Sequence, residues 1–287
     1  MIIPYAAGGA IDNATRILAD KTEKILGTPI VVINNAAGGG AAGALAVTQA
    51  KPDGYTLLAG TSGVLILKPI LTPELRFRHG DFTPVCRTTA IPLAIWVMND
   101  APWKTLKELV DYAKKNPGKL RATVGQAGTL IDVVMNLFKS EAGIDITNIP
   151  TTAGAAQTAA LLGGHSELCM GSLSQGINFL KAGRLRALVS SHKVPGFPMI
   201  KTFEEEGYPG VSLKEWVGMF APKGLPQPVL TKLTKAFETA CKDPSLQEQL
   251  GKLYVLPEYQ NPEETSKALD SGYNLSLKIL KQSGMVK

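Results

Sequence analysis

The sequence predicts an α/β fold with two lobes, and three observations lead to this prediction. First, strand-like and helical segments alternate along the first 65 residues and again after residue 99. Second, the early strand-like segments end in loops of small residues, as the ligand-binding loops of open parallel α/β sheets do. Third, a chain of 287 residues exceeds the usual size of one compact core, so two domains are expected.

The N-terminal segment 4–13 is the first of these loops and the most informative one. Met1-Ile2-Ile3 is typical of a buried strand end, and Asp12 or Asn13 would cap a helix that continues through 14–20. The residues between them are small, with two adjacent glycines, and bring backbone N–H groups and the positive helix end toward a bound group. This predicts an anion site. A simple strand-to-helix connection is the alternative that this loop alone leaves open.

The rest of the first half continues the alternation. A β-branched run at 30–33 predicts a strand covered on both faces. The further expected elements are a glycine-rich loop at 38–43, a helix at 44–49, a strand at 55–59 and a small polar loop at 60–63. Three glycine-rich loops thus follow three strands and are expected to meet at one edge of a sheet.

A second α/β pattern begins near residue 99. Its expected strands are 91–98, 120–124, 146–149, 168–170 and 185–189, its helices are 106–113, 131–142 and 155–162, and its small loops are 125–129, 150–154 and 171–175. A strand at 217–222 and helices at 227–241, 244–253 and 262–283 then follow. We therefore expect one lobe from 1–98 with 222–287, a second from 99–221, and a ligand cleft at the hinge that two crossings create.

Composition excludes several classes of function. The net charge is +6, but the lysines are scattered and aromatic residues make up 6% of the chain, which favours a solvated basic surface over a nucleic-acid face. The three cysteines lie far apart without a CxxC motif, so buried thiols are expected rather than disulfides or a metal site. No apolar run approaches the roughly 20 residues that span a bilayer.

No motif in the chain requires catalysis. Gly38–Gly43 matches GxGxxG, but the acid expected at the end of the following strand is absent from 59–63, so a nucleotide-dependent enzyme is the weaker alternative. Ser62, Ser172 and Ser174 have no GxSxG context. We expect no catalytic residue, no metal and no cofactor. The chain opens directly in a strand without a recognisable leader, which fits a cytoplasmic protein or one whose leader has been removed.

Several motifs together resemble one family, the solute receptors of tripartite tricarboxylate transporters, also called Bug or TctC-type periplasmic binding proteins. The resemblance covers nearly the whole chain. It rests on Pro4–Gly9 with Asp12, on Val32–Asn34 with Gly39, Gly40 and Gly43, on Pro52–Leu58, and on 117–120, 162–165, 181–188 and 220–224.

The resemblance implies a type 2 periplasmic-binding-protein (Venus flytrap) fold of two α/β lobes joined by two crossover strands. It also implies export with a cleaved signal peptide, a periplasmic location, a small carboxylate as ligand and delivery to a membrane permease. In the family, backbone amides of two loops and ordered waters hold one ligand carboxylate. Matched position by position, the implied ligand-binding residues are Tyr5, Ala6, Ala7, Gly8, Gly9, Ala10 and Asp12 in the first loop, Gly125, Gln126, Ala127, Gly128, Thr129 and Asp132 in the second, and Thr61, Ser62, Thr151, Ser172 and Leu173 beyond them.

The chain departs from the family pattern at three places. Ala6 replaces a common proline, Asp132 stands where histidine is common, and Thr151-Thr152-Ala153-Gly154 replaces a frequent Tyr-Lys-Gly. Because these loops contain no Arg or Lys, a mono- or dicarboxylate fits better than citrate, with Tyr5, Val64 and Leu130 as possible walls. Asp132 could also meet a ligand ammonium.

We expect a monomer that serves a transporter. A sensor of the same fold that signals to a partner protein remains the alternative.

Overall fold

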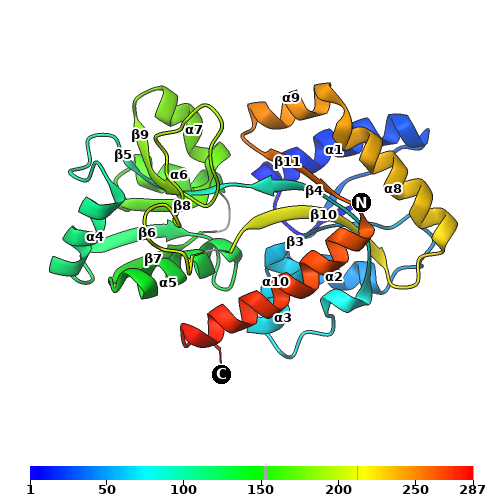
Figure 1. The fold of residues 1–287 in the computed structure, drawn as a ribbon, viewed down its shortest axis with the longest axis horizontal. Coiled ribbons are helices and arrows are strands. Elements are labelled where there is room, and N and C mark those ends of the chain that lie inside the picture. Colours follow the sequence, from blue (N-terminus) through cyan, green and yellow to red (C-terminus); the bar gives the residue numbers. More distant parts are fainter. Residues whose placement is uncertain (152–153, 212, 287) are drawn as a thin grey trace. The chain divides into compact units, whose positions relative to one another are not determined.

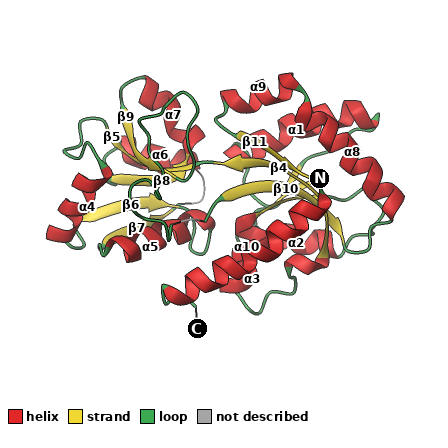
Figure 2. Cartoon of the chain, viewed as in Figure 1, coloured by secondary structure: helices red, strands yellow, loops and turns green. Residues whose placement is uncertain are grey.

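The computed structural model of the protein describes residues 1–151, 154–211 and 213–286. The chain divides into two compact units, one made of Met1–Ile91 with Glu215–Lys287 and the other of Pro92–Lys214. Each unit contains one β-sheet with helices packed against it, which confirms the predicted α/β class (Figures 1 and 2).

The sheet of the first unit has the strand order β11-β4-β10-β3-β1-β2. Its strands are β1 (Ile2–Ile3), β2 (Ile33–Asn34), β3 (Leu58–Thr61), β4 (Phe82–Ile91), β10 (Glu215–Pro222) and β11 (Leu256–Gln260). Strand β1 is parallel to β2 and β3, whereas β10 runs antiparallel to β3 and β4, so the sheet is mixed. The strands β4 and β11 were not expected from the sequence.

The expectation that 30–33 is a strand covered on both faces is wrong. Only Ile33 and Asn34 form β2, at the edge of the sheet, and the side chains of Val31 and Ile33 are 69% and 56% exposed. The β-branched residues satisfy the extended backbone of an edge strand without being buried, which hydrophobic pattern alone cannot distinguish from a central strand.

The helices of the first unit pack against this sheet. Helices α1 (Ala10–Leu26), α8 (Gln227–Lys242) and α9 (Pro244–Lys252) contact one another above the sheet in Figure 1, and α2 (Ala41–Thr48), α3 (Lys68–Leu71) and α10 (Pro262–Gln282) lie below it. The core buries Ile3 and Met219 from the sheet and Phe237 from α8. Gly27 ends α1 in the left-handed conformation (φ +67°), which glycine adopts without strain.

The segment 60–63 is not a loop, contrary to the sequence prediction. Strand β3 continues to Thr61, and a π-helical turn η1 (Gly63–Leu67) follows and leads into α3. The Cβ of any larger residue at Gly60 would lie within 2.7 Å of the side chains of Leu65 and Phe220. Gly60 is therefore required by close packing, and Thr61 and Ser62 lie in a buried part of the unit.

The sheet of the second unit has the order β7-β6-β8-β5-β9. Its strands are β5 (Leu93–Met98), β6 (Leu120–Val124), β7 (Ile146–Pro150), β8 (Leu168–Ser172) and β9 (Leu185–Ser190), and its helices are α4 (Leu106–Lys115), α5 (Leu130–Ala142), α6 (Gly154–Leu162) and α7 (Leu173–Lys181). The expected loop 171–175 is wrong, because Gly171 and Ser172 end β8 and α7 starts at Leu173. The other expected strands and helices of this region are confirmed to within two residues at each end, and the strand expected at 91–98 is β5, which starts at Leu93. Of the loop expected at 150–154, Pro150 ends β7 and Gly154 begins α6, and residues 152 and 153 lie outside the described residues.

Candidate ligand-binding loops

The first loop joins β1 to α1 and differs from the sequence prediction in where the helix begins. Gly9, with φ −80° and ψ 171°, is the N-cap and Ala10 is the first helical residue. Asp12 is therefore the third residue of the helix, so neither Asp12 nor Asn13 caps it. Gly8 has φ +84°, a conformation that favours glycine, and this lets the backbone turn sharply into the helix.

The carboxylate of Asp12 holds this turn in place. One oxygen, Oδ2, accepts the Gly8 N–H at 2.9 Å, and Arg16 Nε donates to both carboxylate oxygens at 3.0 and 3.1 Å. Asp12 is only 2% exposed. Burial alone would raise the pKa of Asp12, but the hydrogen bonds from Arg16, Asn34 and Gly8 outweigh it and lower that pKa below its ordinary value. The loop is thus fixed by a charged side chain.

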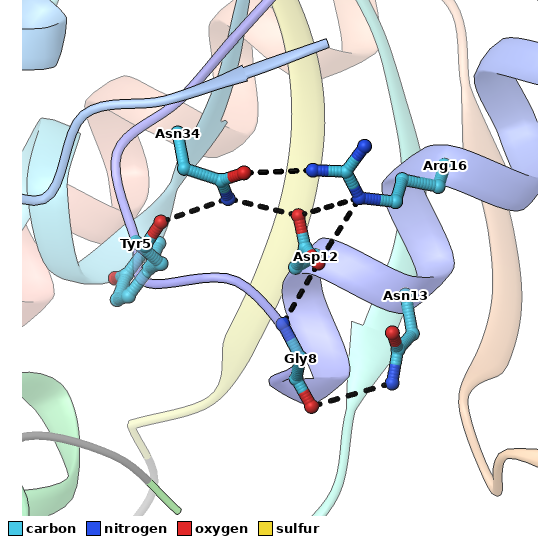
Figure 3. A network of polar contacts seen from close by, with 6 residues as sticks. All are labelled: Tyr5, Gly8, Asp12, Asn13, Arg16 and Asn34. Carbon is cyan, nitrogen blue, oxygen red and sulfur yellow. Dashed lines mark hydrogen bonds and ion pairs between the residues drawn. The ribbon is translucent and has the colours of Figure 1, made fainter.

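Asn34, at the end of β2, completes the network shown in Figure 3. Its Nδ2 donates to Asp12 Oδ1 at 2.8 Å and to the carbonyl oxygen of Tyr5 at 3.0 Å, and its Oδ1 accepts from Arg16 at 2.7 Å. The register of β1 with β2 places Asn34 beside Ile3, directly before the loop. The Asn34 side chain therefore connects Tyr5, near the start of the loop, with Asp12, in the first turn of the helix that follows it.

The second loop, in the other unit, has the same construction. It joins β6 to α5, with Gly128 at φ +76°, Thr129 as the N-cap and Asp132 as the third helical residue. The Gly128 N–H donates to Asp132 Oδ2 at 3.0 Å, and Asn148 on β7 donates to Asp132 Oδ1 at 3.0 Å. The strand β7 is parallel to β6, as β2 is to β1.

The two loops differ in charge. Arg16 neutralises Asp12 in the first loop, whereas Asn136 takes the corresponding place in the second and donates to Asp132 Oδ1 at 3.3 Å. Lys139 bonds to Asn148 and not to Asp132 itself, and its Nζ lies 3.4 Å from Asn148 Oδ1. The carboxylate of Asp132 thus accepts hydrogen bonds from neutral groups and forms no ion pair with any residue that the structure describes.

Each loop presents the same chemistry to its surroundings. The first-turn N–H groups of a helix have no carbonyl acceptor within that helix, and they lie at the positive end of its dipole. In these two loops the Asp side chain accepts the preceding glycine N–H. Within the described residues no loop carbonyl accepts the first-turn amides of Ala10, Ile11, Leu130 and Ile131, so they can bond to another acceptor. An anion is the partner such amides bind best.

Sequence reasoning missed this shared construction, although a signal for it is present. The two loops share the pattern Gly-x-x-Ile-Asp, at 8–12 and 128–132, and each is followed by an Asn on the next strand. The Asp residues were interpreted as caps or ligand contacts, because their acceptor role toward the preceding glycine depends on where each helix begins.

The third predicted contact region, Thr61 and Ser62, lies in the first unit beside the first loop. The Tyr5 hydroxyl is 2.8 Å from Thr61 Oγ1, and Ser62 Oγ donates to Glu215 Oε1 at 3.3 Å. Thr61 is fully buried and Ser62 and Glu215 are 6% and 5% exposed. Burial, and then the charge of Glu215, raise the pKa of Tyr5. Glu215 is not among the predicted site residues. The signal that could have identified it is its position as an acidic residue directly before the apolar run 216–222.

The remaining predicted residues lie at strand ends in the second unit. Thr151 bonds the carbonyl oxygen of Val124 through both its N–H (3.0 Å) and its hydroxyl (2.9 Å). Ser172 Oγ is 3.0 Å from Ser174 Oγ, and the Leu173 N–H donates to the Pro92 carbonyl at 2.7 Å. Thr152 and Ala153, where the chain departs from the family pattern, lie outside the described residues. Of the possible walls, Val64 and Leu130 are buried and Tyr5 is half-buried.

Two glutamines near these strand ends are further candidates that the sequence did not reveal. Gln157 is 2% exposed, and the Oε1 atoms of Gln157 and Gln175 accept no hydrogen bond from any described residue. A Cβ built at Gly171 would lie 2.3 Å from Gln175 Oε1 and 3.1 Å from Gln157 Oε1, so both amides converge on this glycine. Buried amide oxygens in such a place favour a group that donates hydrogen bonds.

The acidic side chains, the cysteines and the glycines of the GxGxxG segment have the following surroundings. Across 1–151, 154–211 and 213–286, no group of three or more His, Cys, Asp or Glu side chains could hold a metal ion. The cysteines Cys86, Cys169 and Cys241 are free and buried. Gly40 and Gly43 serve packing, because a Cβ there would lie 2.7 Å from the Pro4 carbonyl and 2.8 Å from the Asn35 carbonyl. None of the helices in the described segments is long and apolar enough to cross a membrane.

Solved structures support this fold over the whole chain. The structure of the periplasmic binding protein BugD is similar with a TM-score of 0.90 and 29% identity, covering 99% of this chain and 96% of BugD. MatC from Rhodopseudomonas palustris, solved with bound malate, gives a TM-score of 0.88 and 26% identity over 97% of both chains. A second R. palustris protein, solved with adipate, gives 0.91 and 25%, over 99% of this chain and 96% of that one.

The same assignment follows from the sequence. Residues 14–285 match the family described as tripartite tricarboxylate transporter family receptor, whose members are solute-binding receptors rather than enzymes. The match spans both units, and the fold is the two-lobed fold of the Bug and TctC periplasmic binding proteins. The chain therefore belongs to the TctC family of solute-binding receptors.

Proposed function

We propose that this protein is an extracytoplasmic receptor that captures a small carboxylate and delivers it to a membrane permease of the tripartite tricarboxylate type. The observation that carries the proposal is the duplicated loop. Two helices, one in each unit, begin with a glycine turn that an Asp carboxylate closes, so that the amides of both first turns are left for an anion. Family membership and the malate and adipate bound to structural neighbours support a carboxylate as that anion.

The preorganised turns explain how such a site would gain affinity. Charge-assisted hydrogen bonds from backbone amides to a carboxylate are stronger than neutral ones, and they strengthen when water is excluded. Because Asp12 and Asp132 fix the loops before any ligand arrives, little conformational entropy is lost on binding. We infer that the first loop, together with the region of Thr61 and Ser62, offers hydrogen bonds to a ligand carboxylate, and that the second loop does so in the other unit.

The absence of basic side chains from these loops limits the charge of the ligand. Arg16 is engaged with Asp12 and Asn34, and the second loop contains the carboxylate of Asp132. A mono- or dicarboxylate is therefore favoured over citrate. Gln157 and Gln175 would accept hydrogen bonds from a hydroxyl or ammonium group elsewhere on the ligand.

A thermal-shift experiment with a matched pair of variants tests this proposal. A ligand that binds only the folded protein raises its melting temperature by mass action. We expect shifts with malate, adipate or related small carboxylates, a smaller shift with citrate and none with a dinucleotide. Asp132→Asn should need about tenfold more ligand for the same shift, because the Gly128 N–H then loses its hydrogen bond to a charged carboxylate.

The control is Asp145→Asn, which removes an exposed carboxylate from the same unit and should respond like the wild type. Equal responses in all three proteins would overturn the role of the second loop. A shift with the dinucleotide and none with any carboxylate would overturn the receptor assignment for this chain.

A further inference from the structure

Glu215 has an unusual position, because it is the first residue of β10 and the point at which the chain returns to the first unit. Its register partner on β4 is Ile91, the last residue before the chain leaves that unit. A carboxyl group that is 5% exposed in such a place is costly unless it has a function or is fully hydrogen-bonded.

The partners of Glu215 connect it to the first loop. Ser62 Oγ donates to its Oε1 at 3.3 Å, and the Thr61 hydroxyl and the Gly63 N–H also bond to the carboxyl group. Thr61 Oγ1 in turn lies 2.8 Å from the hydroxyl of Tyr5. A short chain of polar groups therefore leads from Glu215 to the loop whose amides face the anion.

The charges around Glu215 do not neutralise it. The groups that act on its carboxyl are two hydroxyls and one backbone N–H, and none of them carries a charge. Arg87 on β4 is bound to Glu258 at 2.6 Å and lies over the Trp216 ring, and Lys214 is exposed. The charge of Glu215 acts on Tyr5, where it adds to the effect of burial in raising the pKa of the tyrosine hydroxyl.

We propose that Glu215 couples proton binding to ligand binding, and that it takes up a proton when an anion binds to the first loop. The inference rests on the proposed function. An ionised Glu215 close to Tyr5 opposes the arrival of a second negative charge, whereas a protonated Glu215 does not, and it can donate a hydrogen bond within the same network.

Protonation of Glu215 within the physiological range makes this coupling measurable. Burial raises the pKa of Glu215 to about 7, and the hydrogen bonds from Thr61, Ser62 and Gly63 only partly oppose this. A bound carboxylate raises that pKa further. The affinity for the ligand is therefore highest below pH 7 and falls as the pH rises through 7, while protons are taken up on binding.

The test is calorimetric titration of malate and of adipate into the wild type, Glu215→Gln and Glu263→Gln at pH 6, 7 and 8.5. Carboxyl groups of free ligands titrate near pH 4 to 5, so the charge on the ligands changes little over this range. Titrations in two buffers of different ionisation enthalpy report the number of protons taken up. Glu263→Gln removes an exposed carboxylate from α10 and controls for net charge.

We expect the wild type and Glu263→Gln to bind about tenfold more weakly at pH 8.5 than at pH 6, with proton uptake near pH 7. Glu215→Gln should show a nearly constant affinity and no uptake. The same pH dependence and uptake in all three proteins would overturn this inference and leave the proposed function intact. Absence of binding by the wild type to both ligands at every pH would overturn the proposed function and this inference together.

Discussion

The strongest prediction about the protein without ligand concerns the cost of burying Glu215. In the folded protein burial raises the pKa of Glu215 to about 7, from an ordinary value of 4.5. Between pH 4.5 and pH 7 the folded protein therefore keeps a proton on Glu215 that the unfolded chain has released. The associated stability is fully present below pH 4.5 and is lost as the pH rises through 7.

The magnitude follows from the two pKa values. One pKa unit corresponds to about 1.4 kcal/mol, so the free energy of unfolding should fall by about 2 to 3 kcal/mol between pH 5 and pH 8 on account of Glu215 alone. Glu215→Gln keeps the shape of the side chain and removes this term. For a unit of this size the difference amounts to a change in melting temperature of about 5 to 10 °C.

Scanning calorimetry is the appropriate assay, because a chain with two compact units need not melt in a single transition. The melting temperature of Glu215→Gln minus that of the wild type should increase from pH 5 to pH 8. The difference should appear in only one transition if the units melt separately. A difference that stays within 1 °C across this pH range would refute the assignment of a buried, titrating carboxyl to this position.

Three further predictions concern the first loop, the second unit and the cysteines. Gly9→Ala should weaken carboxylate binding at least tenfold. It should change the stability little, because Gly9 has an ordinary φ and the nearest atom to an added Cβ lies 3.9 Å away. The control Gly251→Ala, which has open space on α9, should bind normally, and equal affinities in the two variants would contradict the role of the loop. Gly176→Ala should destabilise the second unit by about 1 to 3 kcal/mol or more, because its Cβ would lie 2.3 Å from the Trp96 ring, and an unchanged melting profile would show that this contact is wrong. A thiol reagent should label none of the three buried cysteines in the native state until denaturant is added, so rapid native labelling would contradict their burial.

The sequence predicted most of the elements because local signals and tertiary structure agree there. The helices at 106–113 and 262–283 have clear caps and amphipathic faces, and the structure confirms both. The run at 30–33 failed because exposure depends on the place of β2 in the sheet order, which no local pattern encodes. The segment at 171–175 failed because its small residues look like a loop, although they end β8 and begin α7.

The sequence predicts where the two glycine loops lie, before α1 and before α5, and the structure has them there. It does not predict the role of Asp12 and Asp132, which depends on hydrogen bonds to the glycine four residues earlier and to an Asn on the next strand. The contact between Glu215 and Thr61 could not be predicted, because the two residues lie 154 positions apart in the sequence and the pairing of β10 with β3 brings them together.

The most direct test of the receptor assignment is a calorimetric titration of the wild-type protein at pH 6 with malate, adipate, citrate and ATP. We expect saturable one-to-one binding of malate, adipate or both, weaker binding of citrate and no binding of ATP. Tight binding of ATP with no response to any carboxylate would contradict the assignment of this protein as a carboxylate receptor.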